Sequence, residues 1–153
     1  MHVVDEVLIA PKGNLFMTLK RNPNFTIFSD FLAQTGLDKE LENGPYTVFA
    51  PGDDAFRKLG NETLQRLHND QDILEELLKY HIVHGVLWRA GMHSTYLETL
   101  VPHDKIFIRK SFFGFLSVEN ALIISRDIPA TNGVIHEIHK VLDIEHLRNN
   151  IIG

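Results

Sequence analysis

Residues 47–56, TVFAPGDDAF, decide how this chain folds, because they predict a strand that ends at a proline and leads into a helix. The first three residues are β-prone, and Pro51 must leave the strand because it has no N–H to donate to a ladder. We expect Asp53 or Asp54 to cap the helix that follows, with Phe56 on its apolar face.

A second stretch, residues 132–142 or NGVIHEIHKVL, predicts a strand near the other end of the chain. Its first two residues, Asn132 and Gly133, are a turn signal. In a strand, successive side chains point to opposite faces of the sheet. Val134, His136 and Ile138 should therefore share one face, with Ile135, Glu137 and His139 on the other.

These two stretches resemble the two signature motifs of the fasciclin domain, an extracellular adhesion module. The pair Tyr80-His81 resembles a third landmark of that family, so the resemblance extends from about Asn14 to Leu142. Three ordered matches are a strong signal. The resemblance implies an α+β fold, a wedge of two β-sheets with about seven strands, flanked by short helices. The motif residues expected to hold this structure are Thr47, Phe49, Pro51, Phe56, Asn132, Gly133 and His136.

The composition is typical of one globular domain. The chain has 153 residues, of which 44% are hydrophobic and 23% are charged. Its net charge of -5, without any block of Lys or Arg, argues against nucleic acid as a partner. No window approaches the ~18 consecutive apolar residues that a membrane span requires, so we expect no direct membrane insertion. The absence of cysteine neither requires nor excludes an oxidising compartment.

A weak internal repeat suggests how the chain is organised. Residues 2–8, HVVDEVL, align with residues 136–142, HEIHKVL. In a tandem array the first copy would be the closing strand of the preceding module. We therefore expect residues 1–10 to be that strand or an N-terminal extension, 11–145 to be a single fasciclin-type domain, and 146–153 to be a tail or linker. The alternative is a chance similarity between two short β-prone segments.

The first half of the chain predicts helices. Asn14 should cap one helix, and a second should run from about Phe25 to Gly36 with its phenylalanines on one face. Two short helices are expected at 54–59 and 62–68. A longer one should begin with a capping box formed by Asp72 and Glu75 and should end before Gly85. Its buried stripe should consist of Ile73, Leu74, Leu77 and Leu78.

From residue 86 onward the pattern changes to short strands, punctuated by Gly114 and Pro129. The strands are expected at 86–88, 99–101, 105–109, 115–118 and 121–124. Within 105–109, the alternation of side chains places Ile106 and Ile108 on a more buried face of the sheet than Phe107.

The family resemblance directs attention to Asp127 and Ile128, which precede the closing motif. Fasciclin modules use short surface tracts built around an Asp-Ile pair as integrin ligands. A ligand carboxylate such as that of Asp127 can complete the coordination of a hard divalent cation, and Ile128 would add apolar contact. The alternative is structural: Asp127 organises a turn before Pro129 while Ile128 fills the core. The flanking Ser125-Arg126 differs from the acidic or lysine-containing versions of the family.

Tyr80 and His81 form the second candidate adhesive tract. A tyrosine at the end of an amphipathic helix commonly packs its ring, and a histidine between apolar neighbours is commonly buried and hydrogen-bonded. We therefore favour a structural role for the pair, with binding as a second role. We also expect His136 to be buried and hydrogen-bonded to the backbone.

Catalytic and metal chemistry find little support in the sequence. The pairs His81/His84 and His136/His139 have a spacing that sends strand side chains to opposite faces, and no Cys or carboxylate cluster completes a metal site. No nucleophile elbow or Gly-rich phosphate loop is present. We predict that the protein binds no cofactor and no metal and that it is not an enzyme. An acid-base enzyme built from His81, His84 and a carboxylate is the weaker alternative and requires a cleft.

Two sequons, at Asn24 and Asn61, are consistent with a secreted glycoprotein, although both asparagines also suit helix N-caps. Asn61 is the better glycan candidate because its surroundings are polar.

Together these observations predict a secreted or cell-surface adhesion module without catalytic activity. Its expected partners are cell-surface receptors such as integrins, matrix proteins or like modules. The alternative function is a scavenger-type domain that binds a small ligand, lipid or polysaccharide. Such a domain would use the aromatic segment formed by Phe107, Phe112, Phe113 and Phe115. The exposure of these rings discriminates between a binding patch and ordinary core.

Overall fold

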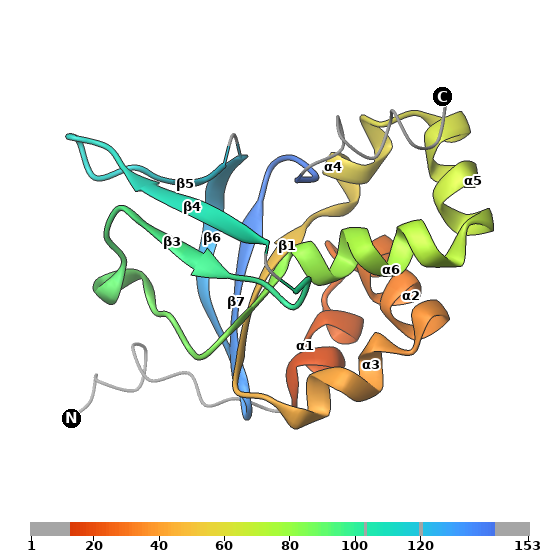
Figure 1. Cartoon of the computed structure of the whole chain (residues 1–153), viewed down its shortest axis with the longest axis horizontal. Helices are drawn as coiled ribbons and strands as arrows, with labels where there is room; N and C mark the ends of the chain where they lie inside the picture. The colour runs from red at the N-terminus through yellow and green to blue at the C-terminus, as the bar shows by residue number, and fades with distance from the viewer. Residues whose placement is uncertain (1–12, 103, 120, 143–153) are drawn as a thin grey trace.

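A computed structural model describes residues 13–102, 104–119 and 121–142, so the predictions for 1–10 and 146–153 fall outside it. Helices gather on one side of a seven-stranded sheet (Figure 1). The helices are α1 (Leu15–Arg21), α2 (Thr26–Thr35), α3 (Leu37–Glu40), α4 (Asp53–Arg57), α5 (Asn61–Asn69) and α6 (Gln71–Tyr80), with 3-10 turns η2 (Leu41–Asn43) and η3 (Arg89–Gly91). The strands are β1 (Tyr46–Pro51), β2 (Ile82–His84), β3 (Thr95–Glu98), β4 (Lys105–Lys110), β5 (Leu116–Val118), β6 (Ala121–Ala130) and β7 (Gly133–Ile138).

The predicted α+β fold with about seven strands is confirmed. The strand order is β2-β1-β7-β6-β5-β4-β3, with β1 and β7 parallel and every other neighbouring pair antiparallel. The two predicted sheets are joined through β6, which pairs with β5 at Ala121 and Leu122 and with β7 from Ile123 onward. A bridge between Val83 and Thr99 brings the two ends of the strand order close together.

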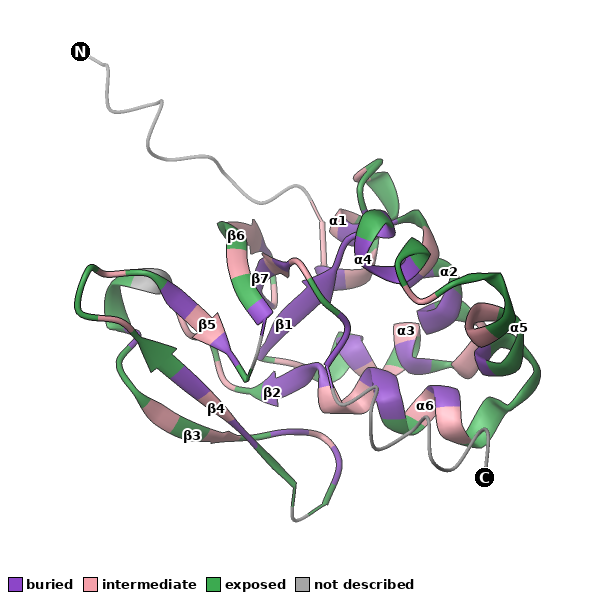
Figure 2. Ribbon diagram, turned by 90° about the horizontal axis from the view of Figure 1, so that it is seen from above, coloured by how far each residue is buried: buried purple, intermediate pink, exposed green. Residues whose placement is uncertain are grey.

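The parallel pair β1 and β7 forms the wall between two hydrophobic cores, which explains why both strands are almost continuously buried. The first core lies under the helices and includes Val48 and Ile135. The second lies toward β4 and β5 and includes Phe49 and Ile138, so the two signature stretches share a core. Figure 2 shows buried residues concentrated where the helices meet β1. The alternation predicted for residues 134–138 is consistent with this division.

Local signals explain most helix ends. The Asn14 side chain accepts a hydrogen bond from the Met17 N–H and caps α1, as predicted. Gly36 ends α2 in the left-handed region with φ of 81°. The capping box predicted for α6 is wrong, because Asp70 is the N-cap and accepts from the Ile73 N–H. Ile73 is only half-buried, whereas the three leucines of the predicted stripe are buried.

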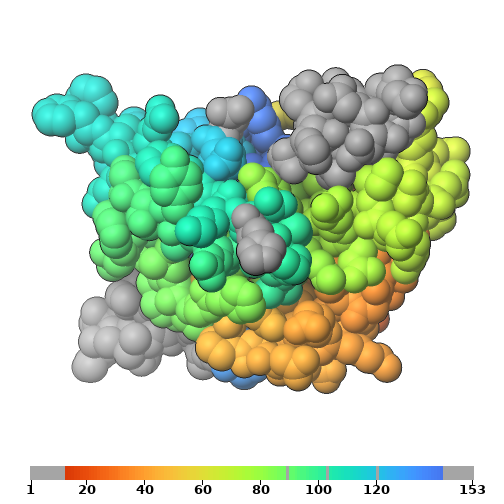
Figure 3. Space-filling view, in the orientation of Figure 1, coloured from red at the N-terminus to blue at the C-terminus, as the bar shows by residue number. Residues whose placement is uncertain are grey.

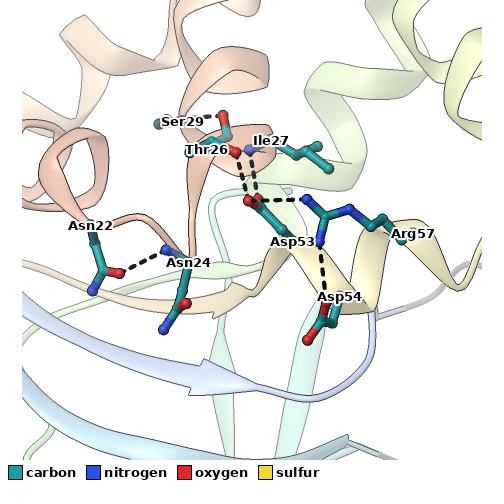
Figure 4. Close-up of polar contacts among 8 residues, drawn as sticks. All are labelled: Asn22, Asn24, Thr26, Ile27, Ser29, Asp53, Asp54 and Arg57. Carbon is teal, nitrogen blue, oxygen red and sulfur yellow. Dashed lines mark hydrogen bonds and ion pairs between the residues drawn. The ribbon is translucent and has the colours of Figure 1, made fainter.

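The aspartate predicted to cap α4 has a different role. α4 begins after Gly52 without a side-chain cap, and Asp53 instead reaches the start of α2. One Asp53 carboxylate oxygen accepts from the Ile27 N–H at 2.8 Å and the other from the Thr26 hydroxyl at 2.6 Å (Figure 4). Because Phe25, the N-cap of α2, provides no side-chain acceptor, Asp53 satisfies the helix end from 26 residues away.

Two strand predictions are wrong. Residues 86–88 form no strand, because Gly85 turns the chain with φ of 86° and the Leu87 N–H bonds to the Thr47 hydroxyl instead of a neighbouring strand. Residues 99–101 follow β3 rather than forming a strand, and β3 itself was not predicted. The burial of β3 alternates only between intermediate and exposed, so its hydrophobic pattern is weak.

Gly133 lies directly against the backbone of β1. A Cβ atom there would collide with the Tyr46 carbonyl oxygen and would lie 2.9 Å from a methyl group of Leu15. Gly133 is therefore required by the close approach of two backbones.

Candidate functional site

His136 connects three segments at the inner end of the candidate adhesive tract. Its imidazole Nε2 lies 2.7 Å from the Leu87 carbonyl oxygen, and its Nδ1 accepts a hydrogen bond from the Asp127 N–H at 3.1 Å. The Phe49 ring stacks on it with centroids 5.8 Å apart. Because Nδ1 accepts, Nε2 must carry the proton that is donated to Leu87 in the neutral ring. The predicted buried, backbone-bonded histidine is confirmed.

Burial disfavours the charged form of this histidine. Burial lowers the pKa of His136, and this effect outweighs the hydrogen bond to Leu87 and the Asp127 carboxylate, both of which raise it. The Asp127 carboxylate lies 3.9 Å from Nδ1.

Asp127 lies in a bulge of β6 and not in a loop. The register between β6 and β7 shifts between Ile123 and Ser125 and again between Ser125 and Ile128. Asp127 has φ of 59°, a left-handed conformation that aspartate tolerates better than most residues. Its side chain is 39% exposed. The bulge therefore holds a carboxylate at the surface with its backbone N–H fixed by His136.

Ile128 is half-buried beside it. It pairs with Ile135 of β7 and packs against the first core. Pro129 continues the strand opposite Val134, so no separate turn precedes it. In the structural alternative, the turn organised by Asp127 is wrong, whereas the core role of Ile128 is met in part by its packing. Only part of this side chain is available to a partner.

Tyr80 and His81 occupy a different part of the molecule, with β1 and β7 lying between β2 and β6 in the sheet. His81 is 1% exposed. Its Nδ1 lies 2.8 Å from the Leu77 carbonyl oxygen and its Nε2 accepts from the Leu142 N–H at 2.9 Å, which ties the end of α6 to the end of the described chain. Burial lowers the pKa of His81 to about 4. Tyr80 is half-buried against the second core.

Asn132 joins three elements at the opposite end of β7. Its side-chain oxygen accepts from the Leu15 N–H at 2.9 Å, and its amide donates to the Leu41 carbonyl at 2.5 Å. Its own carbonyl accepts from the Tyr46 N–H at 3.2 Å. The Asn-Gly pair predicted as a turn signal therefore also fixes the start of α1 and the entry to β1.

The two sequon asparagines are exposed and neither is an N-cap, so that alternative is wrong. Asn61 is the first residue of α5, and the N-cap is Gly60. Asn24 precedes the N-cap Phe25, and its carbonyl accepts from the Asp53 N–H. In Figure 4 the Asn24 side chain points away from the Asp53 contacts.

The geometry required for an acid-base enzyme is not assembled from His81 and His84. A surface recess of about 580 Å³ is lined by His84 together with Glu98, Asp104 and Lys105, whereas His81 is buried elsewhere. His139 is half-buried, and its Nδ1 accepts from the Leu122 N–H. Within the part of the chain that the structure describes, no three His, Cys, Asp or Glu side chains are grouped to hold a metal ion.

Sequence reasoning missed three features of this region. Thr47 is buried, and its hydroxyl donates to the Gly85 carbonyl while accepting from the Leu87 N–H. Asp53 and Asn132 make contacts with residues far away in the chain. The positions of these three residues inside the two motifs indicate that they matter for the fold. Sequence spacing, however, does not identify the distant residues to which they bond.

Comparison with known proteins places the chain in a family. A model of the fasciclin domain matches residues 23–144. The chain belongs to the fasciclin domain family. This fasciclin domain is 33% identical over 146 residues to transforming growth factor-beta-induced protein ig-h3 of Sus scrofa, covering 93% of the chain and 21% of that protein. It therefore spans about a fifth of that relative's length.

A second relative and a solved structure also match most of the chain. The uncharacterized protein sll1735 of Synechocystis is 39% identical over 117 residues, which cover 76% of this chain and 86% of that protein. The structure of a FAS1 domain pair from the insect cell adhesion molecule fasciclin I matches with a TM-score of 0.73 at 19% identity. The match covers 86% of this chain and 51% of that one. Among the residues described, the helices of this fasciclin domain are too short or too polar to cross a membrane.

Proposed function

We propose that this fasciclin domain is an extracellular, non-enzymatic adhesion module that contacts a partner through Asp127 and Ile128. The observation that carries the proposal is the half-exposed carboxylate of Asp127, presented on a bulge whose backbone is fixed by buried His136. The family membership supports it, as does the fold shared with an insect cell adhesion molecule.

The chemistry of the tract suits a receptor that holds a divalent cation. A hard cation prefers oxygen ligands, and a carboxylate held by a rigid strand loses little freedom when it binds. Integrins, matrix proteins and like modules are the partner classes proposed. Because Ile128 is half-buried and the tract is short, a single domain should bind weakly, and tandem copies would add avidity.

A cell-attachment assay on the immobilised domain tests the tract. Asp127→Asn is the decisive variant, because asparagine also tolerates a positive φ and the substitution removes only the charge. We expect attachment to fall at least about tenfold, the loss typical of a central charged contact. Asp30→Asn, an exposed aspartate on α2, is the matched control. Undiminished attachment of Asp127→Asn would reject the tract.

Ile128→Ala requires a second measurement, because Ile128 also contacts the first core. Urea unfolding of the same preparation separates a loss of stability from a loss of contact. Lower attachment with unchanged unfolding supports a direct role, whereas equal losses in Ile128→Ala and the buried substitution Ile135→Ala assign Ile128 to the core.

We further propose that Asn61, and less strongly Asn24, carry glycans and that the protein is secreted or anchored at the cell surface. The exposure of both side chains supports this. Mass spectrometry of the native protein should find a glycan on Asn61. An unmodified cytosolic form would contradict the proposed localisation.

A further inference from the structure

The connection between β4 and β5 places two phenylalanines at the tip of a protruding hairpin. Phe112 is 97% exposed and Phe113 is 82% exposed. In Figures 1 and 3 this teal hairpin projects from the upper left of the molecule. Both rings are exposed because the two residues form the turn itself.

The turn is closed by its own backbone. The Gly114 N–H donates to the Ser111 carbonyl at 3.0 Å, the Ser111 N–H donates to the Phe115 carbonyl at 2.8 Å, and the Phe115 N–H donates to the Ser111 hydroxyl. Gly114 takes the positive φ that such a turn requires. Polar residues usually occupy the two central positions. Here the rings of Phe112 and Phe113 meet edge to face, with their centroids 5.4 Å apart. Among the described residues, neither ring makes a contact with a third aromatic ring.

The stem behind the tip is locally basic in a protein whose net charge is -5. Residues 105–118 contain Lys105, Arg109 and Lys110 but neither Asp nor Glu. Arg109 and Lys110 are exposed and immediately precede the turn. The hairpin therefore presents apolar rings at its apex and positive charges directly behind them.

We propose that the β4–β5 hairpin docks on a lipid bilayer that carries anionic headgroups. The Phe112 and Phe113 side chains would enter the interface, while Arg109 and Lys110 would contact the headgroups. A protruding tip can insert between the headgroups of a bilayer, because lipids move apart more easily than the atoms of a folded protein surface. Phenylalanine has no polar atom to bond sugar hydroxyls, and the two rings meet at 85° without forming a flat stacking platform, so a polysaccharide fits less well.

This contact differs from the membrane insertion that the sequence argued against. That prediction concerned a span of consecutive apolar residues, whereas shallow docking needs only a small apolar tip and nearby cations. It also does not depend on Asp127, which lies on β6.

Vesicle sedimentation tests the proposal with the full 153-residue chain. Vesicles of phosphatidylcholine mixed with phosphatidylglycerol should bind the protein, and vesicles of phosphatidylcholine alone should bind it at least tenfold less. The double variant Phe112→Ser/Phe113→Ser should lower partitioning at least tenfold, since serine suits both turn positions. Arg109→Gln/Lys110→Gln should lower it too and should reduce its salt dependence. Met17→Ser, at an exposed apolar residue of α1, should have no effect.

A second readout locates the tip directly. Phe113→Trp in a Trp88→Phe background places the single tryptophan in the turn, and its emission should shift to shorter wavelength on anionic vesicles. Absent partitioning, or partitioning unchanged by the phenylalanine double variant, would overturn the proposal. Self-association of the protein in the absence of vesicles would also overturn the proposal if it rises with concentration and is abolished by the phenylalanine double variant. The tip would then dock on a second copy of the chain.

Discussion

At the scale of single residues, His81 of the Tyr80-His81 landmark and His136 of the closing motif act as hydrogen-bonding groups inside the fold. His81 joins the Leu77 carbonyl to the Leu142 N–H, and His136 joins the Leu87 carbonyl to the Asp127 N–H. Each bridge requires one protonated and one unprotonated ring nitrogen. Protonation of either ring would remove the acceptor, so both bridges depend on the neutral form.

This arrangement predicts a loss of stability in acid. The pKa of His81 is 6.5 before burial and about 4 in the folded protein, so between these values the unfolded chain binds a proton that the folded one does not. The free energy of unfolding should therefore fall by about 3 kcal/mol as the pH drops from 6.5 to 4, and the slope that His81 contributes should fade within about one pH unit above 6.5. His136 acts in the same direction. Urea unfolding across this range measures the slope.

The variant His81→Gln isolates the effect. It should be less stable at neutral pH, because a buried bridge is disturbed, but its stability should depend less on pH between 4 and 6.5. His68→Gln, which removes an exposed imidazole from α5, is the control and should retain the slope. An unchanged slope in His81→Gln would contradict the assignment.

At the scale of elements, the parallel pair β1 and β7 determines how the two motifs work together. Both strands are buried on both faces, and Gly133 of β7 lies directly against the Tyr46 backbone of β1. Asn132, at the start of β7, makes side-chain hydrogen bonds to the backbone of α1 and η2. Asp53, just beyond the end of β1, accepts a hydrogen bond from the backbone of α2. The motif residues thus position helices as well as strands.

Gly133→Ala tests this close approach. The new methyl group would force β1 and β7 apart or displace Leu15, so we expect a loss of about 3 kcal/mol in the free energy of unfolding. Gly91→Ala is the matched control, because a Cβ atom there meets nothing within 4 Å. It should change stability by less than about 0.5 kcal/mol. Equal stability of the two variants in urea unfolding would show that the strands do not meet as described.

At the scale of the whole molecule, the two signature stretches and the family resemblance were sufficient to predict the α+β architecture. β3 was missed because its residues are never fully buried. The capping role of Asp53 was misassigned because its partners lie 26 and 27 residues away, beyond any local pattern. The bulge at Asp127 was missed because it depends on His136 of the next strand. Sequence identified the candidate residues, and tertiary contacts determined their roles.

The molecule also separates its interior from its candidate contact surfaces. The buried histidines lie within the two-core body, whereas the Asp127 carboxylate and the Phe112–Phe113 turn reach the surface on different strands. Asp127→Asn, which tolerates the positive φ of Asp127, should consequently change adhesion more than stability, and substitutions at motif residues should change stability first.

The most direct test of the adhesive role is the divalent-cation dependence of cell attachment, compared between the wild-type domain and Asp127→Asn at equal folded stability. We expect chelation of divalent cations to abolish most wild-type attachment and to leave the residual attachment of Asp127→Asn unchanged, because the carboxylate completes the coordination of the receptor's cation. A cation-dependent component of the same size in both proteins would contradict it.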